Sequence, residues 1–151
     1  MFYEDLSRGK KGESYVRTLM GRRNHTVEDV SNDFSIGFDF YVDDRKCELK
    51  TDNVINYTEN LFLEDYMDYM EGGRAQGWLN TSKAEYLFYL DEKNYNLYIY
   101  ILDELRDYVN KNKCYIPVRS KDDGYKVVYG YCLDKDAVRH QTIANKNVSM
   151  E

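Results

Sequence analysis

The stretch "FDFYVDDRKCELKTD", residues 38–52, constrains the fold most, because apolar and polar side chains alternate through it. Alternation at every second position is typical of strands with one buried face. The runs 37–43 and 46–51 are therefore predicted to be strands, joined by an acidic turn into a hairpin.

The polar face of this hairpin collects side chains that could form a metal site. A turn at Asp44 and Arg45 brings Asp39, Glu48 and Lys50 onto one face. Two neighbouring carboxylates repel each other unless a divalent cation lies between them, and Mg²⁺ prefers such oxygen ligands. A lysine beside them can orient a water molecule or stabilise developing negative charge. A solvent-facing hairpin carries the same residue types, so the spacing alone leaves both interpretations open.

Hydrophobic periodicity predicts the other elements of an α/β domain with a mixed sheet. A helix is expected over about residues 9–21, ending at Gly21, with Glu13 in its first turn. The remaining expected elements are strands at 25–31 and 60–65, an acidic loop at 70–78, a hairpin of strands 85–91 and 96–102, a helix at 103–112, and strands at 114–118 and 125–133. The residues from about 140 onward are expected to form a frayed tail.

The composition is that of a folded chain with one domain, spanning residues 1–151. Hydrophobic residues make up 42% and there is a single proline, which excludes a disordered or collagen-like protein. No apolar stretch is long enough to cross a membrane and the start lacks the apolar core of a signal peptide, so a cytoplasmic protein is expected. The three cysteines are far apart and odd in number, which favours reduced thiols.

The net charge of −6 argues against a protein that holds nucleic acid by bulk attraction alone. The charges are unevenly spread. Residues 1–26 carry six arginines and lysines against three acids, whereas residues 59–71 carry five acids and no base. This distribution is consistent with a site that has a basic entrance and an acidic interior.

Several motifs follow one another in the order of a known family. "GESYV" stands in the predicted first helix, "GFDFYV" leads to Asp39, "CELKTD" supplies a Glu-x-Lys strand, and "GWLNTSKAEYLFYL" follows. Between about residues 12 and 90 the chain resembles the PD-(D/E)xK nuclease superfamily, in particular its small phage-type members. The resemblance implies a restriction-endonuclease-like core, in which a mixed β-sheet is flanked by helices.

The resemblance also implies a role for each polar residue of the hairpin. Asp39 and Glu48 would be carboxylate ligands of Mg²⁺, with Mn²⁺ as a substitute, and the backbone carbonyl of Leu49 would be a further ligand. Lys50 would position or activate the attacking water. Glu13 matches a first-helix glutamate that completes the metal site in many members, although pairing with a basic residue one turn on explains it equally well.

Two positions depart from the family pattern. Phe38 takes the place of the proline before Asp39, a replacement that is widespread among members, and Glu85 stands where relatives often have aspartate. Neither departure removes a group that the catalytic chemistry needs.

Five residues outside the hairpin are weaker candidates. Glu64 could approach the metal or arrange its waters, although an acid at the end of a strand more often faces solvent. Ser82, Lys83 or Arg74 could contact a phosphate or could simply be solvated. His25 could contact DNA or carry a proton, although a histidine in a loop is commonly without function.

The sequence thus predicts a Mg²⁺-dependent endo- or exodeoxyribonuclease, encoded by a phage or mobile element, that hydrolyses DNA with a metal-activated water. DNA versus RNA and the strandedness of the substrate are left open. The alternative is a catalytically silent nuclease-fold protein that binds DNA structures or a phage or host protein partner, in keeping with the negative charge. A structural subunit of a phage assembly is a third hypothesis. A homodimer is expected, because a small nuclease often needs a second copy to surround a duplex.

Overall fold

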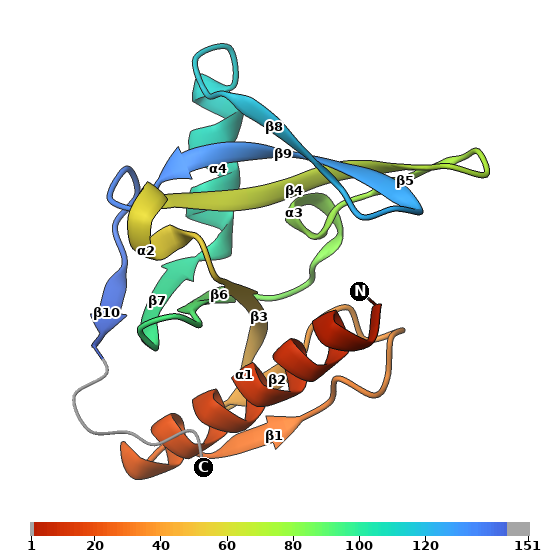
Figure 1. Ribbon diagram of the computed structural model, residues 1–151. Helices are drawn as coiled ribbons and strands as arrows, with labels where there is room; N and C mark the ends of the chain where they lie inside the picture. Colours follow the sequence, from red (N-terminus) through yellow and green to blue (C-terminus); the bar gives the residue numbers. More distant parts are fainter. Residues whose placement is uncertain (1, 145–151) are drawn as a thin grey trace.

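The computed structural model describes residues 2–144 of the chain, with side chains from residue 9 onward (Figure 1). Within these residues the chain forms a mixed α/β structure with two sheets and four helices. In chain order the elements are α1 (Phe2–Arg22), β1 (Val27–Asp29), β2 (Phe40–Val42), β3 (Arg45–Asp52), α2 (Ile55–Thr58), β4 (Asn60–Tyr69), β5 (Arg74–Gln76), α3 (Trp78–Thr81), β6 (Tyr86–Asp91), β7 (Asn96–Ile101), α4 (Leu102–Asn112), β8 (Val118–Asp122), β9 (Lys126–Asp134) and β10 (Gln141–Ile143).

The first sheet contains six strands in the order β1-β2-β3-β6-β7-β10. Neighbouring strands are antiparallel except for β3 and β6, which run parallel, so the expected mixed sheet is confirmed. In the parallel pair Glu48 lies opposite Leu87 and Lys50 lies opposite Tyr89. The polar residues of β3 pair with β6 on one side and extend past the end of β2 on the other.

A second, antiparallel sheet contains four strands in the order β5-β4-β9-β8, which the expectation of one sheet did not include. It forms because β4 and β9 pair along nearly their whole lengths. Figure 1 shows that its two hairpins, β4–β5 and β8–β9, project together beyond β3.

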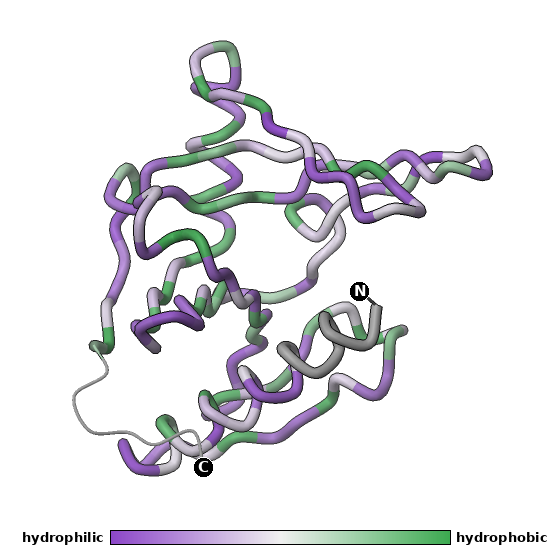
Figure 2. The backbone as a smooth tube through the Cα atoms, viewed as in Figure 1, coloured by the Kyte–Doolittle hydropathy of each residue, from purple (hydrophilic) through white to green (hydrophobic). Residues whose placement is uncertain are grey.

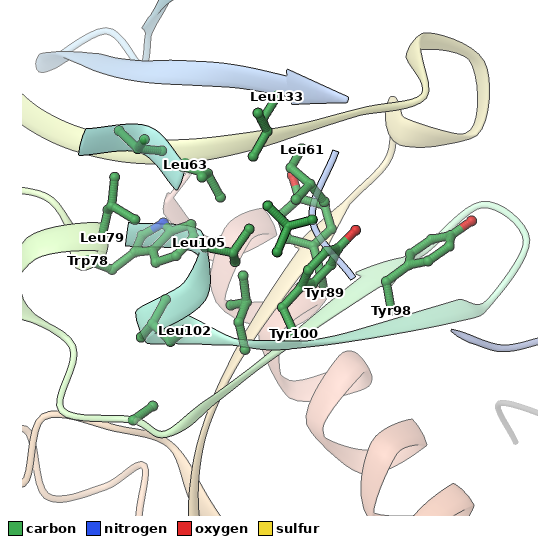
Figure 3. Packing of buried hydrophobic residues seen from close by; sticks show 14 of the residues in the cluster. Leu61, Leu63, Trp78, Leu79, Tyr89, Tyr98, Tyr100, Leu102, Leu105 and Leu133 are labelled. Carbon is green, nitrogen blue, oxygen red and sulfur yellow. The ribbon is translucent and has the colours of Figure 1, made fainter. Parts of the chain in front are cut away.

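Buried apolar side chains form one cluster on each face of the first sheet. The cluster between α1 and the sheet contains Val16 and Leu19. The other cluster joins the opposite face of the sheet to the second sheet and α4, through residues such as Leu61, Tyr100 and Leu105 (Figure 3). Hydrophobic and hydrophilic positions interchange along the strands of both sheets (Figure 2), as strands that bury one face require.

The first helix is longer than predicted. It begins at Phe2 and ends at Arg22, so Glu13 lies in its middle and not in its first turn. The helix continues through Gly12, where α1 packs closely on β3. A Cβ atom at Gly12 would lie 2.5 Å from Cγ2 of Thr51.

The register of the β2–β3 hairpin also differs from the prediction. The turn is at Asp43 and Asp44, which have φ angles of 48° and 68°, and Val42 pairs with Arg45. Positive φ at both central residues is the geometry of the tight two-residue turn that matches the twist of hairpin strands. The predicted pairs were wrong by two positions. A shift of two residues leaves the side chains of β2 and β3 on their predicted faces, because the strand repeat is also two. Phe38, which precedes β2, is the exception and packs in the cluster on the other face from Phe40.

Three further segments differ from the sequence expectations. The acidic loop expected at 70–78 is mostly a hairpin, with β5 pairing back onto β4, and a salt bridge of 2.7 Å joins Arg74 to Asp68. The last strand pair is displaced, because β8 begins at Val118 and contains the charged residues that were expected to form a loop. Pairing with β9 outweighs the polar composition there. Part of the expected tail is β10, which pairs with β7, and residues 145–151 lie outside the described part.

The hairpin β6–β7 lies where the sequence predicted it. Its tyrosines Tyr89, Tyr98 and Tyr100 belong to the larger core cluster.

Candidate functional site

Asp39 is held against β3 by two hydrogen bonds. Its backbone N–H donates to the carbonyl of Cys47 at 3.0 Å. Its Oδ2 atom accepts the backbone N–H of Leu49 at 2.8 Å. The first bond fixes the chain just before β2 and the second fixes the carboxylate, so Asp39 lies beside Glu48.

The backbone of Leu49 takes part in the site. The β2–β3 ladder ends at the pair of Phe40 and Cys47, so Leu49 lies beyond it and donates to the Asp39 side chain instead. The N–H and C=O groups of one strand residue point to the same side of the strand. The Leu49 carbonyl therefore faces the same edge of β3 as Asp39, where the resemblance places a backbone ligand.

Glu48 is a buried carboxyl group, with only 7% of its surface exposed. The pKa of Glu48 is raised to about 8, chiefly by burial and in addition by a hydrogen bond with the adjoining Asp39 carboxylate and by its charge. Lys50 and a hydrogen bond from Ser82 act in the opposite direction. Glu48 lies in the interior beside a second carboxylate. The interpretation of its strand face as the solvent-exposed side of a hairpin is therefore wrong for Glu48.

Lys50 is the only partly exposed member of the polar row on β3 formed by Glu48, Lys50 and Asp52, with 36% of its side chain exposed. Its Nζ atom lies 4.0 Å from Oε1 of Glu48 and 5.5 Å from the centroid of the Trp78 ring. The buried indole face and the carboxylate together direct the ammonium group toward the carboxylate pair.

Glu13 approaches this pair from α1. Burial raises the pKa of the half-buried Glu13 carboxyl, and the charges of Asp29 and Asp39 raise it further. Arg17 lowers the same pKa, but its guanidinium forms its salt bridge with Asp29, at 2.7 Å. A hydrogen bond with Ser31 also lowers the pKa of Glu13. Glu13 therefore lies within electrostatic reach of Asp39, from the middle of the helix.

The donor set suits a hard divalent cation. Two adjacent carboxylates and one strand carbonyl are oxygen ligands, and Mg²⁺ typically takes one or two carboxylates and keeps its remaining positions for water and phosphate. The high pKa of Glu48 marks a place where negative charge lacks compensation, and a cation would supply that compensation. Among residues 9–144, no group of three or more His, Cys, Asp and Glu side chains is arranged to hold a metal.

Ser82 and Lys83 differ in their placement. Ser82 is buried, its hydroxyl is hydrogen-bonded to Glu48, and it accepts the Ala84 N–H at 3.3 Å. It therefore supports the carboxyl group and is shielded from solvent. Lys83 is exposed, and its side chain lies against Gly37, with Cγ and Cδ 3.1 Å from where a Cβ atom of that glycine would be.

The other weaker candidates are not brought into the site. Within the described residues, no hydrogen bond or ion pair joins Glu64 to the carboxylates, and its side chain lies against Gly77. Arg74 is paired with Asp68 in the projecting hairpin. His25 is hydrogen-bonded to Asp43 and lines a cavity of about 600 Å³ on the α1 side of the first sheet, opposite to Glu48.

Sequence reasoning missed Asp52 and Tyr89. Asp52 is buried on the same face of β3 as Glu48 and Lys50, accepts the Val54 N–H at 2.7 Å, and accepts a hydrogen bond from the Tyr89 hydroxyl. The alternation that selected Glu48 and Lys50 would have included Asp52, since it is the next residue on that face.

Comparison with known proteins found no match: no family model, no curated protein and no solved structure is similar to the chain. Fold and site together define an α/β protein of two sheets, in which a buried glutamate on β3, Glu48, lies beside the partly buried carboxylate of Asp39 just before β2. None of the helices in the described part is long and apolar enough to cross a membrane.

Proposed function

We propose that this chain is a Mg²⁺-dependent nuclease that hydrolyses phosphodiester bonds of DNA. The proposal is supported chiefly by one observation: Glu48, buried and with a pKa of about 8, lies beside the Asp39 carboxylate with the Lys50 ammonium 4.0 Å away. A protein gains no stability from a buried carboxyl group held beside a second one, so the arrangement favours a role in binding or chemistry. The same residues carry the resemblance in sequence to the PD-(D/E)xK nucleases, which implies the same activity.

Each residue of the site would have a separate role in the proposed reaction. Asp39, Glu48 and the Leu49 carbonyl would hold Mg²⁺, and Glu13 would act from the opposite side. The cation, when bound, supplies a Lewis acid for the phosphate and the means to lower the pKa of a water molecule. Lys50 would hold the attacking water and stabilise negative charge on the phosphate oxygens. Ser82 would keep the Glu48 carboxyl in its orientation.

Cleavage assays on labelled DNA test the proposal. Single-stranded, duplex and branched DNA would be incubated with the full chain and Mg²⁺ or Mn²⁺, alongside Asp39→Asn and Lys50→Ala. We expect cleavage by the wild type, none by Asp39→Asn and strongly slowed cleavage by Lys50→Ala. Lys93→Ala, an exposed lysine at the β6–β7 turn, is the control and should cleave normally. Absence of cleavage by the wild type on every substrate, with Mg²⁺ binding unchanged in Asp39→Asn, would overturn it.

The second candidate function is binding of DNA structures or of a protein partner without cleavage. The net charge of −6 favours a protein partner at least as well as a phosphate backbone. Metal-independent binding that survives Lys50→Ala and Glu48→Ala would support this function. Loss of binding in either variant would count against it.

A further inference from the structure

One face of the second sheet combines aromatic and basic side chains. Val128 of β9 lies opposite Met67 of β4 and opposite Lys121 of β8, so these three share one face. The Lys121 ammonium lies 4.3 Å from the centroid of the Phe62 ring, which places Phe62 on that face as well. We name this surface the aromatic–basic face, and its distinctive members are Phe62, Tyr69, Arg119, Lys121, Tyr125 and Lys126.

The Phe62 ring lies over Gly130 of the neighbouring strand. A Cβ atom at Gly130 would lie 2.7 Å and 2.8 Å from atoms of that ring, so the ring needs a glycine beneath it. Arg119 lies opposite Gly130 on the other side. Phe62 is thus an aromatic surface with Arg119 and Lys121 beside it.

A second aromatic group lies near the ends of the two hairpins. The rings of Tyr69 and Tyr125 are 6.5 Å apart, and these residues are 38% and 48% exposed. The Lys126 ammonium lies 5.3 Å from the Tyr125 ring and 3.7 Å from the Met67 sulfur. The pairing of an aromatic ring with a cation therefore occurs twice along this face.

The cations of this face are available to a ligand. In the described part of the chain, no salt bridge engages Arg119, Lys121 or Lys126, whereas Arg17 and Arg74 each hold an aspartate. The register places two acids on the same face, Glu64 opposite Gly130 and Asp134 opposite Asn60 at the far end of β9. The result is a locally positive surface on a protein of net charge −6, which favours an anionic partner.

The face also adjoins the candidate site. The Tyr89 hydroxyl donates to Asp52 and accepts the Phe62 N–H at 3.0 Å, so it links the polar row of β3 to Phe62. The charges of Arg119, Lys121 and Asp52 all influence the pKa of Cys132, which burial raises, and this places the cations close to the same row. Both hairpins that carry the face project beyond β3 (Figure 1).

We propose that the aromatic–basic face binds single-stranded nucleic acid and leads the strand to the Asp39–Glu48 site. Exposed rings stack on bases that are not paired, while free cations neutralise phosphates. A duplex hides the faces of its bases and would use only the cations. The inference names single-stranded nucleic acid as the substrate class of the proposed nuclease. Only the cleavage of the bound strand rests on that proposed function, because binding to the face does not require it.

Fluorescence anisotropy of the full chain in EDTA, where no metal-dependent cleavage occurs, tests the binding step. The probes are labelled oligothymidine and oligouridine of about 20 nucleotides, long enough for one binding domain, and a DNA duplex of the same length. We expect one or both single strands to bind more tightly than the duplex. Arg119→Gln combined with Lys121→Gln should weaken binding about tenfold or more and reduce the slope of log affinity against log salt by about 1.4.

Tyr125→Ala should weaken binding of the preferred single strand about tenfold, because one stacking contact is lost. The charge-matched control is Lys93→Gln combined with Lys113→Gln, two exposed lysines outside the face, which should leave the affinity nearly unchanged. Equal losses in the control and in the Arg119 and Lys121 variant, or tighter binding of the duplex, would overturn the inference. A change of oligomeric state in the face variants, with unchanged affinity, would do so too and would indicate a contact with a second copy.

Failure of this inference is distinguishable from failure of the proposed function. Cleavage by the wild type in Mn²⁺, together with normal binding by the face variants, would overturn the inference alone. Selective single-strand binding that depends on the face, without cleavage under any metal condition, would support the inference while the nuclease proposal fails.

Discussion

Asp39 and Glu48 lie side by side and share a hydrogen bond, and burial holds the pKa of Glu48 at about 8. The Glu48 carboxyl group therefore carries a proton near neutral pH in the absence of a cation. This relationship connects stability, metal binding and the proposed chemistry, since a metal and the proton compete for the same oxygens.

The stability of the metal-free protein should fall as pH rises from about 4.5 to about 8. The pKa of Glu48 is near 4.5 in the unfolded chain and about 8 in the folded one, so the folded state binds the extra proton between these values. Each pKa unit corresponds to about 1.4 kcal/mol, so the loss should be a few kcal/mol at most. Urea unfolding in EDTA at several pH values measures it. In Glu48→Gln the decline should largely disappear, and an unchanged decline would contradict the assignment.

Mg²⁺ should stabilise the protein more at pH 8 than at pH 5, because it must displace the proton from Glu48 to bind. Thermal unfolding with and without Mg²⁺ at both pH values measures the effect. Removal of the metal with EDTA should reverse it. Asp39→Asn should show no stabilisation at either pH, and an equal gain in that variant would place the metal elsewhere.

Lys50→Ala should lower the rate of DNA cleavage by roughly 100- to 1000-fold, as expected when one donor that stabilises developing charge is removed. Metal binding should remain, since Lys50 is not a ligand. Single-turnover cleavage and Mn²⁺ titration of the same sample separate the two effects. Normal cleavage by Lys50→Ala would remove this residue from the mechanism.

Gly12→Ala should destabilise the protein by roughly 1–3 kcal/mol, because the added methyl group would lie 2.5 Å from Cγ2 of Thr51 and separate α1 from β3. Gly9→Ala is the matched control on the same helix. A Cβ atom at Gly9 meets nothing within 4 Å, so this substitution should stabilise the helix by about 0.5–1 kcal/mol. Urea unfolding measures both, and equal effects would contradict the close approach of α1 to β3.

Tyr89→Phe should destabilise the protein by roughly 1–3 kcal/mol, because it removes the hydrogen bond from the hydroxyl to the buried Asp52. Tyr57→Phe is the control, since Tyr57 is 70% exposed. Thermal unfolding of the two variants should therefore differ clearly. An equal, small effect in both would indicate that Asp52 does not depend on Tyr89.

The alternation in residues 38–52 was sufficient to predict the hairpin and the shared face of Glu48 and Lys50, whereas Asp39 lies just before β2 and reaches Glu48 from the edge of β3. The alternation was insufficient for the register, which was wrong by two residues because the turn lies at Asp43 and Asp44. A local pattern with a period of two cannot distinguish registers that differ by two. For the same reason, Glu48 and Lys50 still lie on their predicted face of β3.

The polar face shows the limit of local patterns most clearly. Alternation predicted that Glu48 would lie on the polar face of the hairpin, and such a face is expected to be exposed to solvent. Glu48 is buried instead, because β6 pairs along β3 and the second sheet packs over that face. The strands that cover it come from distant parts of the chain, so no local signal could report them.

The sequence by itself determined the hairpin, the tyrosine-rich strand pair, α4 and the face on which the charged residues of β3 lie, because these depend on short-range periodicity. Only the tertiary structure decided that α1 spans Phe2–Arg22, that a second sheet exists, and that Asp39 and Glu48 share an environment in which Glu48 holds a proton. The physical reason is that burial is a property of long-range contacts. A carboxyl group acquires its unusual pKa from the elements that exclude water around it.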